Sequence, residues 1–302
     1  MSFPSLLDPG FVRELESLRR HLRVRTPSGG TGGQASRRHG SSAEFEDHRP
    51  YSPGDDPRRI DWMAFARTDE PVVKLFRAEE DTIVRLLLDC SGSLAYGNPP
   101  KIDMARRLAA GLGYVALADS QRAQIVVARN QGRAEGPRPS LEWISSRRRG
   151  RAGIPALLRD LSATDLPRGE LDLVRAIDQT VRVAQRPGLL VVFSDFFDPG
   201  PVRDALTRAR TRGHDVALVQ VLDKTEIEPP YEGDYTLEDM ETGRNLELVM
   251  DDASVAAYQA RLAELTDRLQ VWARRHGASY TRVVTDEPIE PAIRRLIART
   301  ID

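Results

Sequence analysis

IVRLLLDCSGS, residues 83–93, is the stretch that decides the fold. Its apolar run has the length of a strand and ends at Asp89, and a polar loop and an amphipathic helix over residues 101–119 follow it. Strand, loop and helix in this order form the first half of a βαβ unit, in which ligands bind beyond the carboxyl end of the strand. Residues two apart in an extended chain project to the same side, so we expect Asp89, Ser91 and Ser93 to present their oxygens together. Three such oxygens suit a hard cation such as Mg²⁺.

Beyond this first unit, apolar segments of strand length and of helix length alternate along the chain. The predicted strands are residues 123–129, 133–135 (a hairpin partner of the preceding strand), 189–194, 215–222 and 279–284. The predicted helices are residues 154–162, 171–185, 202–212, 251–276 and 291–300. This alternation predicts an α/β fold built on one doubly wound, mostly parallel sheet of the Rossmann type.

Composition divides the chain into three predicted regions. Asp8 is placed to cap a helix near the N-terminus, and a Gly/Ser-rich stretch that follows is typical of a flexible loop. A hairpin turn is expected at residues 241–243. The regions are residues 1–43, an N-terminal helix and loop; residues 44–80, a β-rich element; and residues 81–302, the α/β domain with an insertion at 223–250.

The overall composition predicts a soluble, cytoplasmic protein. Hydrophobic residues make up 40% of the 302 residues, which is enough for a substantial core. The formal net charge of -1 gives no general reason to expect a nucleic acid partner. The single cysteine, Cys90, suits a reducing compartment, and we expect it to be a small buried residue. The sequence shows neither an apolar stretch long enough to span a membrane nor a signal peptide.

A second aspartate, Asp195, follows the predicted strand at residues 189–194 in the same way that Asp89 ends the first strand. The central strands of a doubly wound sheet lie side by side, so we expect the two carboxylates to meet above the carboxyl edge of the sheet. The plainer alternative is that the hydroxyls of Ser91 and Ser93 cap the following helix. On that alternative, Asp195 caps a helix or stabilises a turn.

The D-x-S-x-S pattern of residues 89–93, combined with Asp195, resembles the metal-ion-dependent adhesion site of von Willebrand factor A domains. A longer motif, RPYSPGDDPRRIDWMAFART at residues 49–68, resembles the bacterial family called domain of unknown function 58. Further stretches that resemble this family are VKLFRAEED (73–81), VVFSDFFDP (191–199), LEDMETGR (237–244) and ASYTRVVTDEP (278–288). The resemblance therefore covers most of the chain.

The resemblance implies a von Willebrand factor A-like core preceded by a small β-rich element, and a protein that binds other proteins without catalysing a reaction. Members often act alongside MoxR-type AAA+ ATPases as chaperone partners or adaptors. The resemblance also implies that Ser91 and Ser93 bind Mg²⁺ directly, and that Asp89 and Asp195 bind it directly or through water. An ion held in this way keeps an open position, which an acidic side chain of the ATPase or of its client would fill.

One position departs from the adhesion site. Leu171 stands where such sites place a threonine ligand, within residues 169–173 (GELDL). An incomplete ligand set predicts that Mg²⁺ binds weakly or not at all. The residues that could supply the missing oxygen are Thr164, Asp165, Glu170 and Asp172.

Two other functions remain open at this point. Asp55, Asp56 and Asp61 could form the metal site of a hydrolase, although turn formation and ion pairs with neighbouring arginines are the commoner use of such residues. Alternatively, the chain is a metal-free adaptor whose residues 49–68 dock on the partner. The five histidines lack ligand spacing, and the sequence contains no nucleophile elbow and no dinucleotide fingerprint, which argues against the common enzyme classes.

Overall fold

The computed structural model describes residues 5–21, 43–78, 83–119, 121–130, 139–143, 148–164, 167–197, 200–229, 233–238 and 245–301. The chain divides into two compact units. The sheet unit consists of residues 1–27 and 82–302, and the small unit consists of residues 28–81. The predicted strand at residues 133–135 and the predicted turn at residues 241–243 lie outside the described residues.

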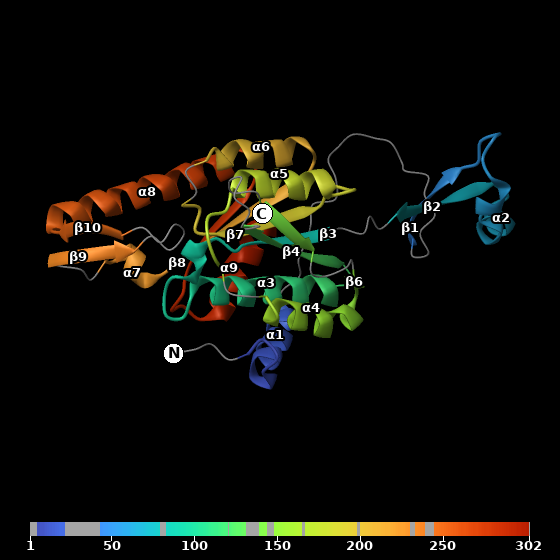
Figure 1. Ribbon diagram of the computed structural model, residues 1–302. Coiled ribbons are helices and arrows are strands. Elements are labelled where there is room, and N and C mark those ends of the chain that lie inside the picture. The colour runs from blue at the N-terminus through green and yellow to red at the C-terminus, as the bar shows by residue number, and fades with distance from the viewer. Residues whose placement is uncertain are drawn as a thin grey trace. The chain divides into compact units, whose positions relative to one another are not determined.

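The sheet unit contains a seven-stranded sheet (Figure 1). The strands are β3 (Ile83–Asp89), β4 (Arg122–Asn130), β5 (Pro139–Trp143), β6 (Arg148–Arg149), β7 (Leu189–Ser194), β8 (Asp215–Leu222) and β11 (Ser279–Val284). Along the path β11-β8-β7-β3-β4-β5 all neighbours pair in parallel except β5, which runs antiparallel to β4, and β6 also pairs antiparallel with β4. The predicted doubly wound, mostly parallel α/β sheet is confirmed. This is the strand order of the Rossmann fold, in which the winding reverses between β3 and β7.

Helices cover both faces of the sheet, as Figure 1 shows. The helices on one face are α1 (Pro9–His21), α3 (Lys101–Ala118), α4 (Ile154–Ser162) and α9 (Ile289–Ile301), and those on the other are α5 (Leu173–Val183), α6 (Val202–Thr211) and α8 (Asp252–Arg275). Successive residues of a strand point to opposite faces of the sheet. Leu86 and Leu88 therefore pack beneath the α1, α3, α4 and α9 face, and Leu87 packs beneath the α5, α6 and α8 face. Burial on both faces explains why β3 is an almost continuous apolar run.

The insertion at residues 223–250 contains a short helix and a hairpin. Helix α7 (Lys224–Ile227) begins with a capping box, in which Asp223 accepts hydrogen bonds from the first turn and Glu226 accepts one from the Asp223 amide. Strands β9 (Gly233–Glu238) and β10 (Asn245–Met250) then pair antiparallel. The capping box fixes Asp223 and Glu226 directly beyond the carboxyl end of β8.

In its described residues, the small unit contains two antiparallel strands with a 3-10 turn (Pro57–Arg59) and a short helix between them in the chain. Strand β1 (Ala43–Pro50) pairs with β2 (Val72–Ala78), and α2 (Trp62–Thr68) lies between them in the chain. Asp61 caps α2 by accepting hydrogen bonds from the amides of its first turn. None of the helices in the described residues of either unit combines the length and the apolar character that crossing a membrane requires.

Candidate functional site

The candidate site lies at the carboxyl edge of the sheet, where the winding reverses. Asp89 is the last residue of β3, and Asp195 directly follows β7, which is the strand paired with β3. Both side chains are buried, and Asp195 is only 2% exposed. A doubly wound sheet places its ligand crevice at this reversal, so the two aspartates occupy the position expected of binding residues.

Asp89 is held by hydrogen bonds from two serines. Its Oδ1 accepts from the Ser91 amide at 2.8 Å, and its Oδ2 accepts from the Ser194 hydroxyl at 2.6 Å. Burial, and secondarily the negative charge of Asp195, raises the pKa of Asp89 to about 6, although the serine hydrogen bonds act in the opposite direction. The pairing of Leu88 with Phe193 places Asp89 and Asp195 at the same edge of the sheet, at the ends of neighbouring strands.

Ser91 and Ser93 present their hydroxyls to each other, with 3.2 Å between the two oxygens. Ser91 precedes a single 3-10 turn, Gly92–Ala95, and within the described chain its side chain makes no capping hydrogen bond to that turn. The alternative of a capping role is therefore not seen at Ser91. Asp195 does accept a local hydrogen bond, from the Phe197 amide at 3.2 Å, so part of the turn-stabilising alternative applies to it.

Lys101 is a central residue of this site, and the sequence did not predict a role for it or for its partners Asp223 and Glu226. Its side chain is 0% exposed, and its Nζ lies 2.8 Å from Asp195 Oδ2 and 2.5 Å from Glu226 Oε1. Burial favours the neutral amine, but the attraction of Asp195 and Glu226 outweighs burial and raises the pKa of Lys101. One signal was available in the sequence: a lysine at the first position of a helix opposes the helix dipole, which favours acidic residues there.

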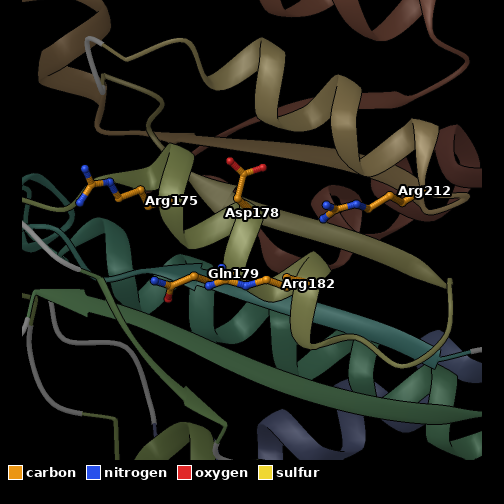
Figure 2. A pocket seen from close by; sticks show the side chains of 5 residues that line it. All are labelled: Arg175, Asp178, Gln179, Arg182 and Arg212. Carbon is orange, nitrogen blue, oxygen red and sulfur yellow. The ribbon is translucent and has the colours of Figure 1, made fainter.

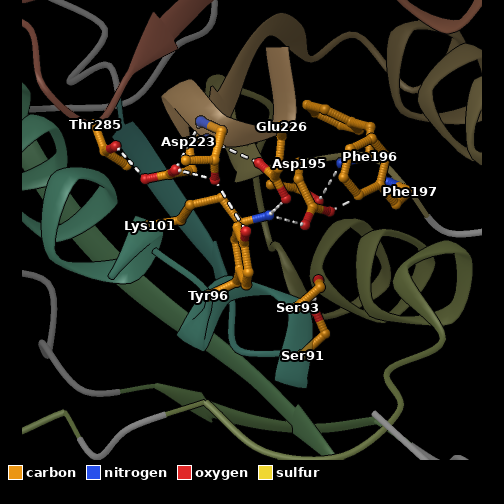
Figure 3. A network of polar contacts seen from close by, with 12 residues as sticks. Ser91, Ser93, Tyr96, Lys101, Asp195, Phe196, Phe197, Asp223, Glu226 and Thr285 are labelled. Carbon is orange, nitrogen blue, oxygen red and sulfur yellow. Dashed lines mark hydrogen bonds and ion pairs between the residues drawn. The ribbon is translucent and has the colours of Figure 1, made fainter. Parts of the chain in front are cut away.

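A second set of hydrogen bonds fixes Glu226 in place (Figure 3). Glu226 Oε2 accepts from the Asp223 amide at 2.8 Å, and Asp223 Oδ2 accepts from the Thr285 hydroxyl at 2.8 Å. Burial would raise the pKa of Asp223, but hydrogen bonds from Thr225 and Thr285 hold it below its usual value. The network thus joins residues beyond the carboxyl ends of β7, β8 and β11 into one polar cluster around the Lys101 ammonium.

The loop that carries Leu171 lies against the loop that carries Ser91 and Ser93. The side chain of Leu171, however, points into the core. The Gly92 amide donates to the Gly169 carbonyl at 2.8 Å, and the Arg168 amide donates to the Cys90 carbonyl at 3.3 Å. Leu171 is buried in the apolar cluster that packs α5 against the sheet. The position resembling the threonine ligand therefore contributes packing instead of an oxygen.

Two of the four residues proposed as substitutes for the threonine, Thr164 and Asp172, use their side-chain oxygens in local structure. The Thr164 hydroxyl donates to the Asp160 carbonyl at 3.3 Å, and Asp172 caps α5 by accepting from the Arg175 amide at 2.9 Å. Glu170 is exposed, and Asp165 lies outside the described residues.

Cys90 is a packing residue. It is buried in the core beneath α3, and burial raises the pKa of its thiol to about 12. A thiol with such a pKa stays protonated at neutral pH and is a poor nucleophile.

The three aspartates of the hydrolase alternative do not form a common site. Asp55 accepts two hydrogen bonds from Arg49, at 2.7 and 2.6 Å, and so forms an ion pair with this arginine. Asp56 accepts from the Arg58 amide at 3.0 Å, and Asp61 caps α2. No group of three or more His, Cys, Asp or Glu side chains in the described part of the chain is arranged to hold a metal ion.

Replacing Asp61 with alanine is expected to destabilise the small unit by about 2 kcal/mol. Asp61 accepts from the Met63 and Ala64 amides, each at 3.1 Å, and lies 2.9 Å from His48 Nε2. Faster hydrogen exchange of the α2 amides, measured by mass spectrometry, would report this loss. Glu70→Ala, a change at an exposed residue, serves as the control, and equal exchange in the two variants would contradict the prediction.

A surface recess lies at helices α5 and α6 (Figure 2). Its lining residues are Arg175, Asp178, Gln179, Arg182 and Arg212. Arg208 neutralises Asp178 through hydrogen bonds of 2.9 and 2.6 Å. Asp178, whose charge Arg208 neutralises, is the carboxylate of this lining, and none of the residues predicted for the site contributes to it.

Comparison with known proteins identifies relatives over most of the chain. A family model described as "Protein of unknown function DUF58" matches residues 47–268. Uncharacterized proteins of Mycobacterium tuberculosis and Mycobacterium bovis are each 32% identical over 235 residues, which cover 74% of this chain and 71% of the relative. An uncharacterized protein of Mycobacterium avium is 33% identical over 141 residues, which cover 45% of this chain and 75% of that protein.

Solved structures with a related arrangement are more distant. BatB from Bacteroides thetaiotaomicron aligns with a TM-score of 0.44 at 15% identity, covering 72% of this chain and 98% of that one. An aerotolerance-related membrane protein from Bacteroides fragilis aligns with a TM-score of 0.43 at 16% identity, with the same coverage. A von Willebrand factor type A protein from Catenulispora acidiphila has a TM-score of 0.36 at 14% identity, covering 87% of this chain and 52% of that one.

Proposed function

The chain belongs to the DUF58 family, and we propose that it is a protein-interaction module that uses the carboxyl edge of its sheet as the contact surface and has no catalytic activity of its own. One observation carries this proposal. At the reversal of the sheet, two neighbouring serine hydroxyls lie beside an aspartate pair whose charge is only partly neutralised. Oxygens arranged in this way suit a cation or a polar group of a partner.

The residues at this edge fit a weakly held Mg²⁺. Hydroxyl and carboxylate oxygens are the ligands that this ion prefers. Four carboxylates, those of Asp89, Asp195, Asp223 and Glu226, gather here, and Lys101 pairs with two of them. We propose that Ser91, Ser93, Asp89 and Asp195 hold the ion. The replacement of the threonine ligand by Leu171 weakens the site.

We further propose that the partner presents an acidic side chain to this edge and that it is a MoxR-type AAA+ ATPase or its client. The support for the ATPase is the family resemblance. The support for an acidic contact is chemical: a Mg²⁺ ion held by few protein oxygens retains open positions for a carboxylate. We also propose a cytoplasmic location, as the composition predicts.

Calorimetric titration with MgCl₂ tests the metal site directly. The wild type is expected to release or absorb heat on binding, and Ser93→Ala is expected to lose most of that signal because a direct ligand is removed. Ser162→Ala is the matched control, since the Ser162 hydroxyl donates only to the Leu158 carbonyl within α4. Equal heats from the wild type and from Ser93→Ala would refute the metal site.

A specific feature of the small unit favours a second candidate, the metal-free adaptor. Trp62 and Met63 on α2 are 61% and 77% exposed, and aromatic and methionine side chains are enriched at protein interfaces. Copurification of a MoxR-type ATPase that persists in EDTA but fails for Trp62→Ala would favour this candidate. Loss of copurification in EDTA would favour the metal-dependent edge.

A further inference from the structure

The Lys101 ammonium is enclosed at the candidate site by two carboxylates and two aromatic rings. Asp195 and Glu226 accept its hydrogen bonds, and the centroids of the Phe197 and Tyr96 rings lie 5.2 and 5.9 Å from Nζ. Figure 3 shows the lysine side chain reaching to both carboxylates, with Tyr96 below it. Charge pairing and ring contacts of this kind stabilise an ammonium that has lost its hydration.

The Lys101 ammonium neutralises much of the negative charge with which Asp195 would attract another cation. The Oδ2 of Asp195 accepts from the ammonium at 2.8 Å, and its Oδ1 accepts from the Phe197 amide at 3.2 Å. A divalent ion bound to Asp195 would also lie next to a positive charge, and this repulsion is strong in a buried site. The ion and the ammonium are therefore alternatives for the same carboxylate.

We propose that Lys101 is a built-in competitor of the divalent cation for Asp195 and is the residue that keeps the metal affinity of this edge low. This inference rests on the proposed Mg²⁺ site. In the metal-free protein the ammonium satisfies Asp195. An ion held by Asp195 would displace the ammonium from this carboxylate, and Glu226, at the start of the 223–250 insertion, would remain the partner of Lys101. Lys101 is thus a positioning residue that links metal occupancy to the insertion.

The test measures Mg²⁺ affinity by calorimetry in two backgrounds. Lys101→Met is compared with the wild type, and the double variant Lys101→Met/Glu226→Gln is compared with Glu226→Gln. In each comparison, removal of the ammonium is expected to tighten Mg²⁺ binding about tenfold or more. If Lys101→Met alone fails to fold, the double variant still gives the measurement. In the double variant, residue 226 is a neutral glutamine and no longer leaves a buried carboxylate without a partner.

A second variant removes a positive charge that does not contact Asp195. It distinguishes competition of Lys101 and Mg²⁺ for Asp195 from the long-range repulsion that any nearby cation exerts. Arg168→Met removes an exposed cation from the neighbouring loop without touching Asp195, and its Mg²⁺ affinity is expected to stay within about threefold of the wild type. Equal affinities with and without Lys101 would overturn the inference and leave the metal site standing. The absence of Mg²⁺ binding in every variant would overturn the inference together with the metal site, while a tenfold gain in Arg168→Met would overturn direct competition alone.

Discussion

Replacing Lys101 with methionine is expected to lower the free energy of unfolding by about 3–5 kcal/mol in metal-free buffer. The change keeps most of the volume of the side chain but removes the ammonium that Asp195 and Glu226 share, at 2.8 and 2.5 Å. Both carboxylates then remain in a region from which water is largely excluded, and a buried charge without a partner is costly. Urea unfolding in EDTA, followed by circular dichroism, measures the loss.

Two further variants make this expectation specific. Adding Glu226→Gln to Lys101→Met is expected to recover about 1–2 kcal/mol, because one of the two unpaired charges is removed. Arg268→Met breaks an ion pair with Glu264 on the exposed face of α8, and its cost is expected to stay below about 1 kcal/mol. A Lys101→Met variant no less stable than Arg268→Met would show that the buried ion pair contributes little.

The sheet could be predicted from the sequence because its strands are short apolar runs with clear ends. Strands β7, β8 and β11 have the predicted bounds, residues 189–194, 215–222 and 279–284. Asp8 also caps α1 as predicted, by accepting from the Gly10 and Phe11 amides. These features depend on neighbours in sequence, which a single chain reveals.

The ends of helices and the partners of charged residues were predicted less well. Helix α5 was predicted at residues 171–185 and is found at Leu173–Val183, because Asp172 caps it and Leu171 packs into the core before it begins. Asp55 pairs with Arg49, on strand β1, a partner that the sequence did not indicate. In both cases tertiary packing decided between several local possibilities.

In the candidate site, too, some features could be predicted from the sequence and others depend on tertiary packing. That Asp89 and Asp195 come close follows from the topology alone, since they end neighbouring parallel strands. The burial of Lys101 depends on Glu226, which is 125 positions away in the chain and which α7 holds beyond β8. A lysine after two prolines is ordinarily an exposed residue of a first helical turn, so its sequence context does not predict a buried role.

Replacing Gly188 with alanine is expected to destabilise the sheet unit by about 3 kcal/mol or more. Gly188 directly precedes β7, at the end of the sheet opposite the candidate site. A Cβ atom there would lie 2.3 Å from the carbonyl oxygen of Ile83 and 3.2 Å from Nη1 of Arg85. The first contact involves the backbone of β3, so no side-chain rotation relieves it.

The expected loss is large because the clash would push apart β3 and β7, two paired strands in the middle of the sheet. The far ends of the same two strands lead to Asp89 and Asp195. Their parallel ladder begins with Val84 opposite Leu189, one residue beyond the clash. Gly213→Ala is the matched control: Gly213 has φ +85, and its added Cβ would come no closer than 3.4 Å to Pro187. Its cost is therefore conformational and about 1 kcal/mol. Urea unfolding of both variants gives the comparison, and a Gly188→Ala loss no greater than that of Gly213→Ala would mean that β3 and β7 can shift apart without weakening the sheet.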